Sequence, residues 1–453
     1  MTQLSDPHPI IPITKALSGS VTLPGSKSIA NRSILLAAMS QRSVTLHDML
    51  FSRDTEIMLT ALEQLGFDTQ IDRDTRKVTV TGLGGEIPED EASIDIGNSG
   101  TSARMITAFL CIKKGGTYHL DGDPPMRKRP IKGLLDALES CGAAQVTYEG
   151  EHGFFPFTLK TLGYPGGTIK ADASASSQIL SALMMAAPFA EKDTTIHILG
   201  NKMRTPYVAM TLDMMEQFGQ AGACDFSTLT FNISAGYPYP EAPANYVVEP
   251  DASAASYLLA LPLVTGGQIT INGLSNSQLQ GDIEFADVLE AVGADIKRDV
   301  SDWIVSRPSD NLHGVTQDFY QFSDTFLTLA AISPLLSGKT HISGIEHTRK
   351  QETDRIHAMA TELKKLGQKV SETEGSITIE PDLEAARAIA QNGPIEIDTY
   401  EDHRVAMSFG ILGCYDLLGQ GKPWLAIRDP HCCSKTFPDF FHVIENLRNG
   451  LAV

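Results

Sequence analysis

Residues 25–36 read Gly-Ser-Lys-Ser-Ile-Ala-Asn-Arg-Ser-Ile-Leu-Leu, so a patch of small and polar residues runs directly into an apolar helical pattern. The same succession returns in five further stretches, which begin at Gly97, Asp172, Pro250, Phe322 and Tyr400. From Gly25 onward, the starts are separated by 72, 75, 78, 72 and 78 residues. A period this regular indicates a repeat architecture. We therefore expect six copies of one structural unit.

Each start is followed by the same order of predicted elements. A short β-like stretch comes first, as in residues 44–46 and 268–271. A second helix with apolar residues at i, i+3 and i+4 follows and ends in glycine, for example Gly66 and Gly293, which suits a left-handed C-cap. Alternating stretches such as 77–81 then predict strands. The unit is helix, strand, helix, strand, with another strand between units, which is an α/β pattern.

The two ends of the chain predict how the units are grouped. The sixth unit stops at Val453 before its closing strands, whereas residues 10–23 form a strand-rich leader ahead of the first unit. We expect the leader to complete the last unit, which gives two lobes of three units. The expected lobes are residues 26–246 and residues 1–25 plus 247–453, with junctions near Pro24-Gly25 and in the Pro-rich stretch 237–243.

Composition argues against several classes of protein. The 453 residues carry 36 Lys+Arg against 55 Asp+Glu, a formal net charge of −19, and 42% of them are hydrophobic. This balance is typical of a folded protein and disfavours a disordered chain, a nucleic-acid binder and a binder of anionic membranes. Length alone suggests about three domains of roughly 150 residues, and the repeat reduces that number to two.

The lack of a recognisable targeting signal and the spacing of the cysteines predict a cytoplasmic protein. The N-terminus shows no basic region followed by an apolar stretch, so we expect no signal or transit peptide. No run reaches the roughly 18 apolar residues of a membrane-spanning helix. The six cysteines lack CxxC spacing, which favours free thiols in a reducing compartment.

The polar patches at the helix starts are the candidate functional sites. Helix N-termini attract anions through their unpaired N–H groups and the helix dipole. Any single patch can be a plain N-cap, but the six patches together also collect cations. These are Lys27, Arg32, Arg104, Arg204, Arg355 and Arg404. The pattern predicts a cleft that binds anionic ligands at the helix starts.

Two other chemistries are disfavoured. The stretch from Gly19 to Ser28 superficially resembles a phosphate-binding loop, but Ser26 stands where that motif requires glycine directly before the lysine. The histidines at 347, 357, 403 and 431 show no spacing typical of metal ligands, so we expect no metal and no cofactor.

Seven ordered motifs resemble the 5-enolpyruvylshikimate-3-phosphate synthase family over almost the whole chain. They are Leu23-Pro-Gly-Ser-Lys-Ser…Asn31-Arg32, Gly97-Asn-Ser-Gly-Thr…Arg104, Arg129-Pro-Ile, Ser176-Ser-Gln178, Gln351-Glu-Thr-Asp-Arg355, Asp402-His-Arg404 and Asp429-Pro…Lys435-Thr-Phe-Pro-Asp439. The resemblance implies a two-lobed inside-out α/β barrel of six βαβαββ repeats, three per lobe, with the active site in the cleft between the lobes. It also implies transfer of the enolpyruvyl group of phosphoenolpyruvate to the 5-hydroxyl of shikimate 3-phosphate, in the shikimate pathway to chorismate and the aromatic amino acids.

The same resemblance implies a role for each matching residue. Asp324 is expected to be the base for the 5-hydroxyl, Glu352 to exchange a proton with the methylene carbon, and Lys27 to be the acid near the bridging oxygen. The residues implied for shikimate 3-phosphate, chiefly on the first lobe, are Lys27, Ser28, Arg32, Ser176, Ser177, Gln178, Arg204, Tyr207, Asp324 and Gln351. Those implied for phosphoenolpyruvate, many on the second lobe, are Lys27, Asn98, Gly100, Arg129, Gln178, Arg355, Arg404 and Lys435.

Several positions depart from the family pattern. Gln351 stands where many members have lysine, which puts one contact with the shikimate ring in doubt, and Arg204 replaces a frequent serine in the phosphate site. His347 replaces a frequent asparagine, and Met105 replaces a proline that is common after Arg104. Glycine rather than alanine at position 100 predicts inhibition by glyphosate, in competition with phosphoenolpyruvate, with Met105 as a modest complication.

Two alternatives remain open at the level of sequence. The sister transferase that acts on UDP-N-acetylglucosamine shares the fold, but it carries Lys-Asn where this chain has Lys27-Ser28. A repeat scaffold without catalysis is disfavoured because Asp324, Glu352 and Lys27 are all present. Gln351, which stands where many family members have lysine, leaves this alternative open. The expected partners are small-molecule substrates of a monomer, without nucleic acid or membrane.

Overall fold

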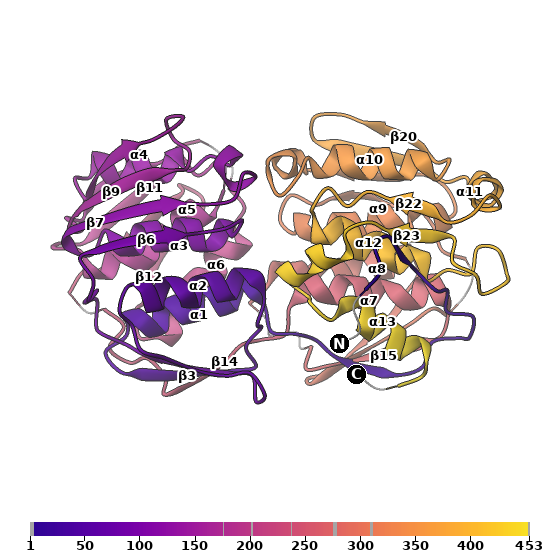
Figure 1. Ribbon diagram of the computed structural model, residues 1–453, viewed down its shortest axis with the longest axis horizontal. Helices are drawn as coiled ribbons and strands as arrows, with labels where there is room; N and C mark the ends of the chain where they lie inside the picture. Colours follow the sequence, from indigo (N-terminus) through magenta and orange to yellow (C-terminus); the bar gives the residue numbers. More distant parts are fainter. Residues whose placement is uncertain are drawn as a thin grey trace. The chain divides into compact units, whose positions relative to one another are not determined.

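The computed structural model describes residues 4–174, 176–200, 203–236, 238–274, 279–308 and 311–451. The chain forms two compact units, Met1–Pro24 with Pro250–Val453, and Gly25–Glu249 (Figure 1). The chain thus passes from one unit to the other at residues 24–25 and again at 249–250, beyond the Pro-rich stretch 237–243. Tyr237, the first residue of that stretch, lies outside the described residues.

The first repeat shows how the sequence forms the unit. Its elements are α1 (Lys27–Met39), β3 (Ser43–His47), α2 (Arg53–Gln64), β4 (Thr69–Asp72) and β5 (Lys77–Thr81). The sheet order is β14-β3-β5-β4, in which β14 (Asn245–Val247) is parallel to β3 and the other pairs are antiparallel. The alternating residues Val44, Leu46, Val78 and Val80 are fully buried, which is the period of a half-buried sheet.

The second and third repeats have the same order of strands. The second consists of β6 (Glu91–Asp95), α3 (Gly100–Leu110), β7 (Lys114–Asp121), α4 (Lys132–Ser140), β8 (Ala144–Tyr148) and β9 (Phe157–Leu162). The third consists of β10 (Gly167–Ala171), α5 (Gln178–Ala186), β11 (Thr194–Ile198), α6 (Pro206–Gln217), β12 (Gly222–Asp225) and β13 (Thr230–Ile233). Their sheets run β6-β7-β9-β8 and β10-β11-β13-β12.

The other unit contains repeats four to six. The fourth has β2 (Ser20–Thr22), α7 (Ala252–Thr265), β15 (Gln268–Asn272), α8 (Phe285–Val292), β16 (Asp295–Arg298) and β17 (Asp302–Ser306). The fifth has β18 (Thr316–Asp318), α9 (Phe326–Ile332), β19 (Thr340–Ser343), α10 (Arg355–Lys365), β20 (Lys369–Glu372) and β21 (Ser376–Glu380), and α11 (Leu383–Ala390) follows it. The sixth has β22 (Ile395–Ile397), α12 (His403–Gly413), β23 (Leu425–Ile427), α13 (Phe440–Arg448) and β1 (His8–Pro9).

The leader is used differently from the expectation. It was predicted to complete the sixth unit over residues 10–23, but the strand that does so is β1, which is antiparallel to β23. Within residues 10–23, β2 instead joins the fourth repeat, parallel to β15. β14, which precedes the fourth repeat in sequence, pairs with β3 of the first repeat. The leading strands of repeats one and four are therefore exchanged at the two chain crossings.

The first helix of each repeat lies in the core of its unit. Every described side chain of α3 and α12 is buried, and α7 is buried from Ala252 to Val264. These helices pack on one another, α3 with α5 and α12 with α9 and α7. The sheets lie outside them and expose alternate residues. Helices inside and sheets outside is the arrangement of an inside-out barrel, and the predicted six-repeat α/β fold is confirmed.

The predicted glycine ends of the second helices are also confirmed. The glycines at 66, 142, 219, 293, 367 and 450 all have positive φ values, which residues with a side chain rarely adopt. All six cysteines are free thiols. Among the described residues, no helix is long and apolar enough to cross a membrane.

Candidate active site

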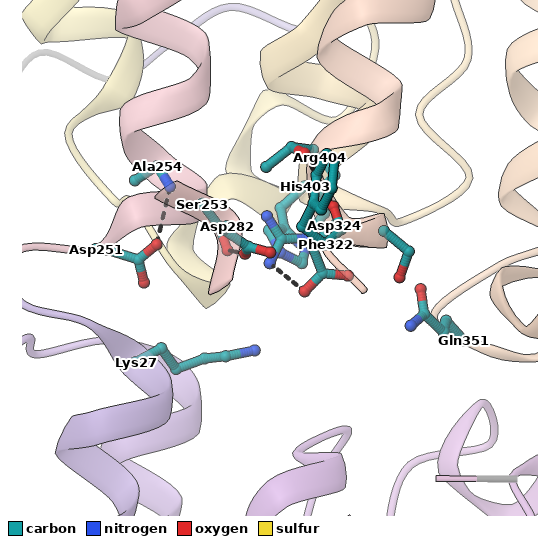
Figure 2. A network of polar contacts seen from close by, with 12 residues as sticks. Lys27, Asp251, Ser253, Ala254, Asp282, Phe322, Asp324, Gln351, His403 and Arg404 are labelled. Carbon is teal, nitrogen blue, oxygen red and sulfur yellow. Dashed lines mark hydrogen bonds and ion pairs between the residues drawn. The ribbon is translucent and has the colours of Figure 1, made fainter. Parts of the chain in front are cut away.

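Asp324 lies between two arginines at the start of the fifth repeat. It is part of the short 3₁₀ turn Ser323–Thr325 that leads into α9. Arg355 donates to its Oδ1 at 3.0 Å, and Arg404 donates to its Oδ2 at 2.8 Å. Figure 2 shows Arg404 and Asp324 in this contact. The carboxylate predicted to be the base is therefore held by two guanidinium groups, and 19% of its side chain is exposed.

Arg355 is the centre of the network in this unit. Its side chain is 2% exposed, and it also donates to Asp402 Oδ2 at 2.7 Å, to Glu352 Oε2 at 2.9 Å and to Gln351 Oε1. Burial by itself would lower the pKa of Arg355, but the charges of Asp402, Glu352 and Asp324 outweigh burial and raise it. The guanidinium is a permanent cation that orders the carboxylates around it.

Helix caps explain why these side chains meet. Asp354 caps α10, so Arg355 is the first residue of that helix, and Asp402 caps α12 by accepting from the backbone N–H of Arg404 at 2.9 Å. Asp402 is completely buried, because Arg355 and the start of α12 satisfy its charge. Asp402 thus holds both the side chain of Arg355 and the backbone of Arg404.

Glu352 and Lys435 form the other side of this network. Lys435 donates to Glu352 Oε1 at 2.9 Å, and both side chains are about nine-tenths buried. Lys435 ends the 3₁₀ segment Pro430–Lys435. Gln351, which departs from the family pattern, accepts from Arg355 and so belongs to the same network. Six of the predicted residues, Asp324, Gln351, Glu352, Arg355, Arg404 and Lys435, are brought together in one unit.

The sequence analysis missed Asp282, a buried carboxyl beside this network. It lies in the 3₁₀ segment Gly281–Glu284 and accepts from Ser253 Oγ. Figure 2 shows Asp282 close to Arg404 and Asp324. Burial, together with the charge of Asp324, raises the pKa of Asp282 to about 7. Gly281–Glu284 is not a repeat start, so the repeat pattern gives no signal for it.

In the other unit, Lys27 begins α1 and pairs with a second carboxylate that the sequence analysis missed. Its Nζ lies 3.3 Å from Asp54 Oδ2, and Asp54 is 2% exposed. Asp54 stands in the first turn of α2, where its charge also suits the helix N-terminus. The cation is thereby held at the start of α1.

Arg32 is a buried cation in the same unit with only neutral hydrogen-bond partners among the described residues. It donates to Thr211 Oγ1 at 2.8 Å, to the Ser28 carbonyl at 3.0 Å and to Ser181 Oγ at 3.4 Å. Burial lowers the pKa of Arg32 to about 10, and a smaller effect of Tyr207 opposes this shift. A buried guanidinium held only by neutral oxygens is suited to an anionic ligand.

Gly100 allows two guanidinium groups to approach the start of α3. A Cβ atom at this position would lie 2.6 Å from Arg129 Nη2 and 3.2 Å from Arg104 Nη1. Arg129 donates to Asn98 Oδ1 at 3.4 Å, and Arg104 donates to the Gly100 carbonyl at 3.1 Å. Three predicted residues, Asn98, Gly100 and Arg129, are therefore in contact. Met105 is buried within α3.

The remaining predicted residues lie at the starts of α5 and α6. Ser176 Oγ accepts from the backbone N–H of Gln178 at 3.2 Å, and Gln178 Nε2 donates to Thr101 Oγ1 at 3.0 Å, which ties α5 to α3. Ser177 is the buried N-cap of α5. Arg204 is half-buried just before α6, and the carbonyl of Tyr207 accepts from Arg32 at 3.5 Å.

Two of the histidines that the sequence analysis considered, His347 and His403, lie beside residues of this network. His347 shares a hydrogen bond of 2.7 Å with Ser323 Oγ, next to Asp324. His403 Nδ1 lies 3.6 Å from Asp402. Within the described ranges, no group of three His, Cys, Asp or Glu residues could hold a metal ion.

Comparison with known proteins places the chain in a family. The family model described as EPSP synthase (3-phosphoshikimate 1-carboxyvinyltransferase) matches residues 11–444. A 3-phosphoshikimate 1-carboxyvinyltransferase of Opitutus terrae is 45% identical over 98% of both chains. A protein of the same name from Photobacterium damsela subsp. piscicida is 42% identical over 95% of this chain and 97% of its own.

Solved structures agree with this assignment. The EPSP synthase of Acinetobacter baumannii superposes with a TM-score of 0.77 at 25% identity, over 98% of each chain. The enolpyruvyl transferase NikO of Streptomyces tendae has the same fold, with a TM-score of 0.70 at 15% identity over 97% of this chain and 96% of its own. The chain therefore belongs to the EPSP synthase (3-phosphoshikimate 1-carboxyvinyltransferase) family.

Proposed function

We propose that this chain transfers the enolpyruvyl group of phosphoenolpyruvate to the 5-hydroxyl of shikimate 3-phosphate and releases phosphate. The observation that carries the proposal is that Asp324 and Glu352 each contact two cations of one buried network, Arg355 with Arg404 and Arg355 with Lys435. Relatives 42–45% identical to this chain are named for this reaction. The sister transferase acting on UDP-N-acetylglucosamine is not favoured by these names.

The two carboxylates have separate roles in the proposal. Asp324 takes the proton of the 5-hydroxyl as its oxygen bonds to the substituted carbon of phosphoenolpyruvate, and the protonated carboxyl of Glu352 donates its proton to the methylene carbon, which gives a tetrahedral intermediate. Glu352 then removes a proton from the resulting methyl group. The bond from carbon to the phosphate oxygen breaks, and Lys27 protonates that oxygen as phosphate leaves. Positioned groups of this kind contribute about 10²–10⁴-fold each.

The cation network gives a reason why the carboxylates become basic when substrate arrives. In this structure the cations Arg355, Arg404 and Lys435 contact the carboxylates of Asp324 and Glu352, and nearby positive charges make a carboxylate a weak base. The phosphate and carboxylate of phosphoenolpyruvate compete for the same cations. Binding of the anion therefore transfers the cations to the substrate and returns basicity to Asp324 and Glu352.

The proposed substrate contacts follow the clusters described above. Ser28 and Arg32 bind the carboxylate of shikimate 3-phosphate, with Gln178 and Tyr207 against its ring and Gln351 beside it. Its phosphate binds Ser176, Ser177 and Arg204. Phosphoenolpyruvate binds Lys27, Asn98, Gly100, Arg129, Gln178, Arg355, Arg404 and Lys435. The unit Gly25–Glu249 thus carries most contacts to shikimate 3-phosphate, and the other unit carries Asp324 and Glu352.

Phosphate release tests the proposal. The purified chain should release phosphate from phosphoenolpyruvate only when shikimate 3-phosphate is present, and UDP-N-acetylglucosamine should not replace that acceptor. Asp324→Ala and Glu352→Ala should each lower kcat by about 10²–10⁴-fold. Asp295→Ala, which changes an exposed carboxylate of β16, is the matched control and should retain the wild-type rate. Release that does not depend on the acceptor, or near wild-type rates in both variants, would refute the proposal.

Three finer properties belong to the same proposal. The free thiols support a cytoplasmic location. The self-contained cores of both units support a monomer, which sedimentation checks. The lack of a side chain at Gly100, which lets the guanidinium of Arg129 approach the start of α3, supports competition between glyphosate and phosphoenolpyruvate. Turnover unimpaired at high glyphosate and low phosphoenolpyruvate would contradict the last point.

A further inference from the structure

The turn immediately before α12 has a backbone conformation that its residues do not favour. Tyr400 and Glu401 have φ values of +56° and +59°, and Asp402 N–H donates to the Thr399 carbonyl at 2.9 Å. This is the pattern of a type I′ turn, whose two central positions are normally glycine, asparagine or aspartate. A tyrosine and a glutamate in consecutive left-handed positions are strained. Some other interaction must hold this turn.

The Tyr400 side chain supplies that interaction. Its hydroxyl donates to Glu362 Oε1 at 2.6 Å, although 37% of Tyr400 is exposed. Glu362 lies on α10, is completely buried, and also accepts from Asp398 N–H at 3.2 Å. Burial, followed by the neighbouring Glu362, raises the pKa of Tyr400, so its hydroxyl remains a donor at physiological pH.

The tether connects the two helices that form the cation network. α10 begins at Arg355 and α12 is capped by Asp402, and the two helices pack on each other. Arg355 contacts Asp402 at one end of α10, and Tyr400 reaches Glu362 two turns further along the same helix. Two contacts, rather than one, therefore define how the first turn of α12 lies against α10. That first turn carries Arg404, which donates to Asp324.

We infer that Tyr400 and Glu362 are a positioning pair that holds the strained turn and thereby places Arg404 for phosphoenolpyruvate. This inference rests on the proposed function and adds residues that do not themselves touch the substrate. It predicts that loss of the tether affects phosphoenolpyruvate selectively, because Arg404 binds that substrate. The implied contacts of shikimate 3-phosphate lie mainly on other elements.

Four chains test the inference: wild type, Tyr400→Phe, Tyr400→Phe with Glu401→Gly, and Tyr118→Phe. The first variant removes only the hydroxyl, and the double variant also relieves strain in the untethered turn. Tyr118→Phe is the matched control, since it removes another tyrosine hydrogen bond, of 2.8 Å to the Glu89 carbonyl in the other unit. We expect Tyr400→Phe to raise KM for phosphoenolpyruvate about tenfold, a ratio equivalent to about 1.4 kcal/mol. The KM for shikimate 3-phosphate should change less than twofold, and the double variant should recover most of the loss.

Hydrogen–deuterium exchange provides a second measurement that does not depend on turnover. Backbone amides of residues 403–407 should exchange at least fivefold faster in Tyr400→Phe, and the double variant should restore their protection. Unchanged exchange in Tyr400→Phe would overturn the inference whatever reaction the chain catalyses. If exchange rises but both KM values move together, the tether is merely structural, and the positioning role is wrong. A wild-type chain without activity would instead refute the proposed function, while exchange would still decide the tether.

Discussion

At the scale of single residues, Arg355 shows how a buried cation and its carboxylates depend on one another. The guanidinium contacts Asp402, Asp324 and Glu352, and Asp402 has no exposure to water. Removing the cation therefore leaves the buried Asp402 carboxylate with only the backbone N–H of Arg404 among the hydrogen-bond partners described above, and such a loss is far more costly than losing a pair at the surface.

Substitution of Arg355 tests this dependence. Arg355→Leu should lower the free energy of unfolding of its unit by about 3–5 kcal/mol. Arg428→Leu, which breaks pairs of a half-exposed arginine with Glu396 and Asp398, should cost about 1 kcal/mol or less. Urea denaturation of both variants gives the comparison, and equal losses would contradict the account of the network.

The raised pKa of Asp282 predicts that the free energy of unfolding depends on pH, and it fixes the sign of that dependence. The ordinary aspartate value is 3.8, and in the folded chain the pKa is about 7. Between these values the folded chain keeps a proton that the unfolded chain has released, so the stability conferred by Asp282 falls as pH rises. The charged groups that face it are Asp324, Arg404 and Asp251.

Asp282→Asn removes this titration while preserving the shape of the side chain. Relative to wild type, the variant should gain stability from pH 4 to pH 7, by at most about 1.4 kcal/mol per pH unit, and the difference should level off above pH 7. Melting temperatures of both chains across pH 4–8 give the measurement. A difference that does not change with pH would show that Asp282 is ionised throughout this range.

Gly100 is the residue at which a single methyl group reaches the proposed phosphoenolpyruvate site. The added carbon of Gly100→Ala would displace the Arg129 guanidinium, because 2.6 Å is well inside van der Waals contact. We expect KM for phosphoenolpyruvate to rise with little change in thermal stability. Gly150→Ala, where the nearest atom is 3.9 Å away, is the matched control. Unaltered KM in Gly100→Ala would remove Arg129 from the proposed binding set.

At the scale of elements, the N-terminal leader is part of the core of the unit that comprises residues 1–24 and 250–453. Leu17, Val21 and Leu23 are at most 3% exposed among residues of α7 and β15. Leu17 also forms a bridge with Gly267, at a distance of about 250 residues along the chain. Stability of the unit therefore requires segments from both ends of the sequence.

Leu17→Ala tests this contribution. Truncation of a buried leucine typically costs about 2–5 kcal/mol, so the unit that contains the leader should melt at a clearly lower temperature. Ile11→Ala provides the control, since Ile11 is 42% exposed and exposed substitutions usually change stability by less than about 0.5 kcal/mol. Similar melting curves for the two variants would show that the leader is not a core segment.

The same leader shows where prediction from sequence ends. The six starts and the glycine ends were predictable because local periodicity determines helices and their caps. The exchange of β2 and β14 between repeats was not, because every repeat offers an equivalent sheet edge and the period does not distinguish among them. At the site, motif residues were predictable, whereas Asp282 and Asp54 acquire their importance only from burial and tertiary contact.

At the scale of the whole molecule, the net charge of −19 coexists with a small group of buried cations. Arg32, Arg104, Arg355, Arg404 and Lys435 are all at most 7% exposed. A minority of the 36 basic residues is thus concentrated where anions are proposed to bind. The global charge describes the solvated surface and does not report on the interior sites.

The central claim is that the chain joins two anionic substrates and releases one phosphate for each bond formed. Phosphorus NMR of equimolar phosphoenolpyruvate and shikimate 3-phosphate with the purified chain tests it directly. We predict that the phosphoenolpyruvate signal decreases while inorganic phosphate and one new phosphate monoester appear in equal amounts. Phosphate without the new ester, or no conversion by a folded chain, would contradict the account.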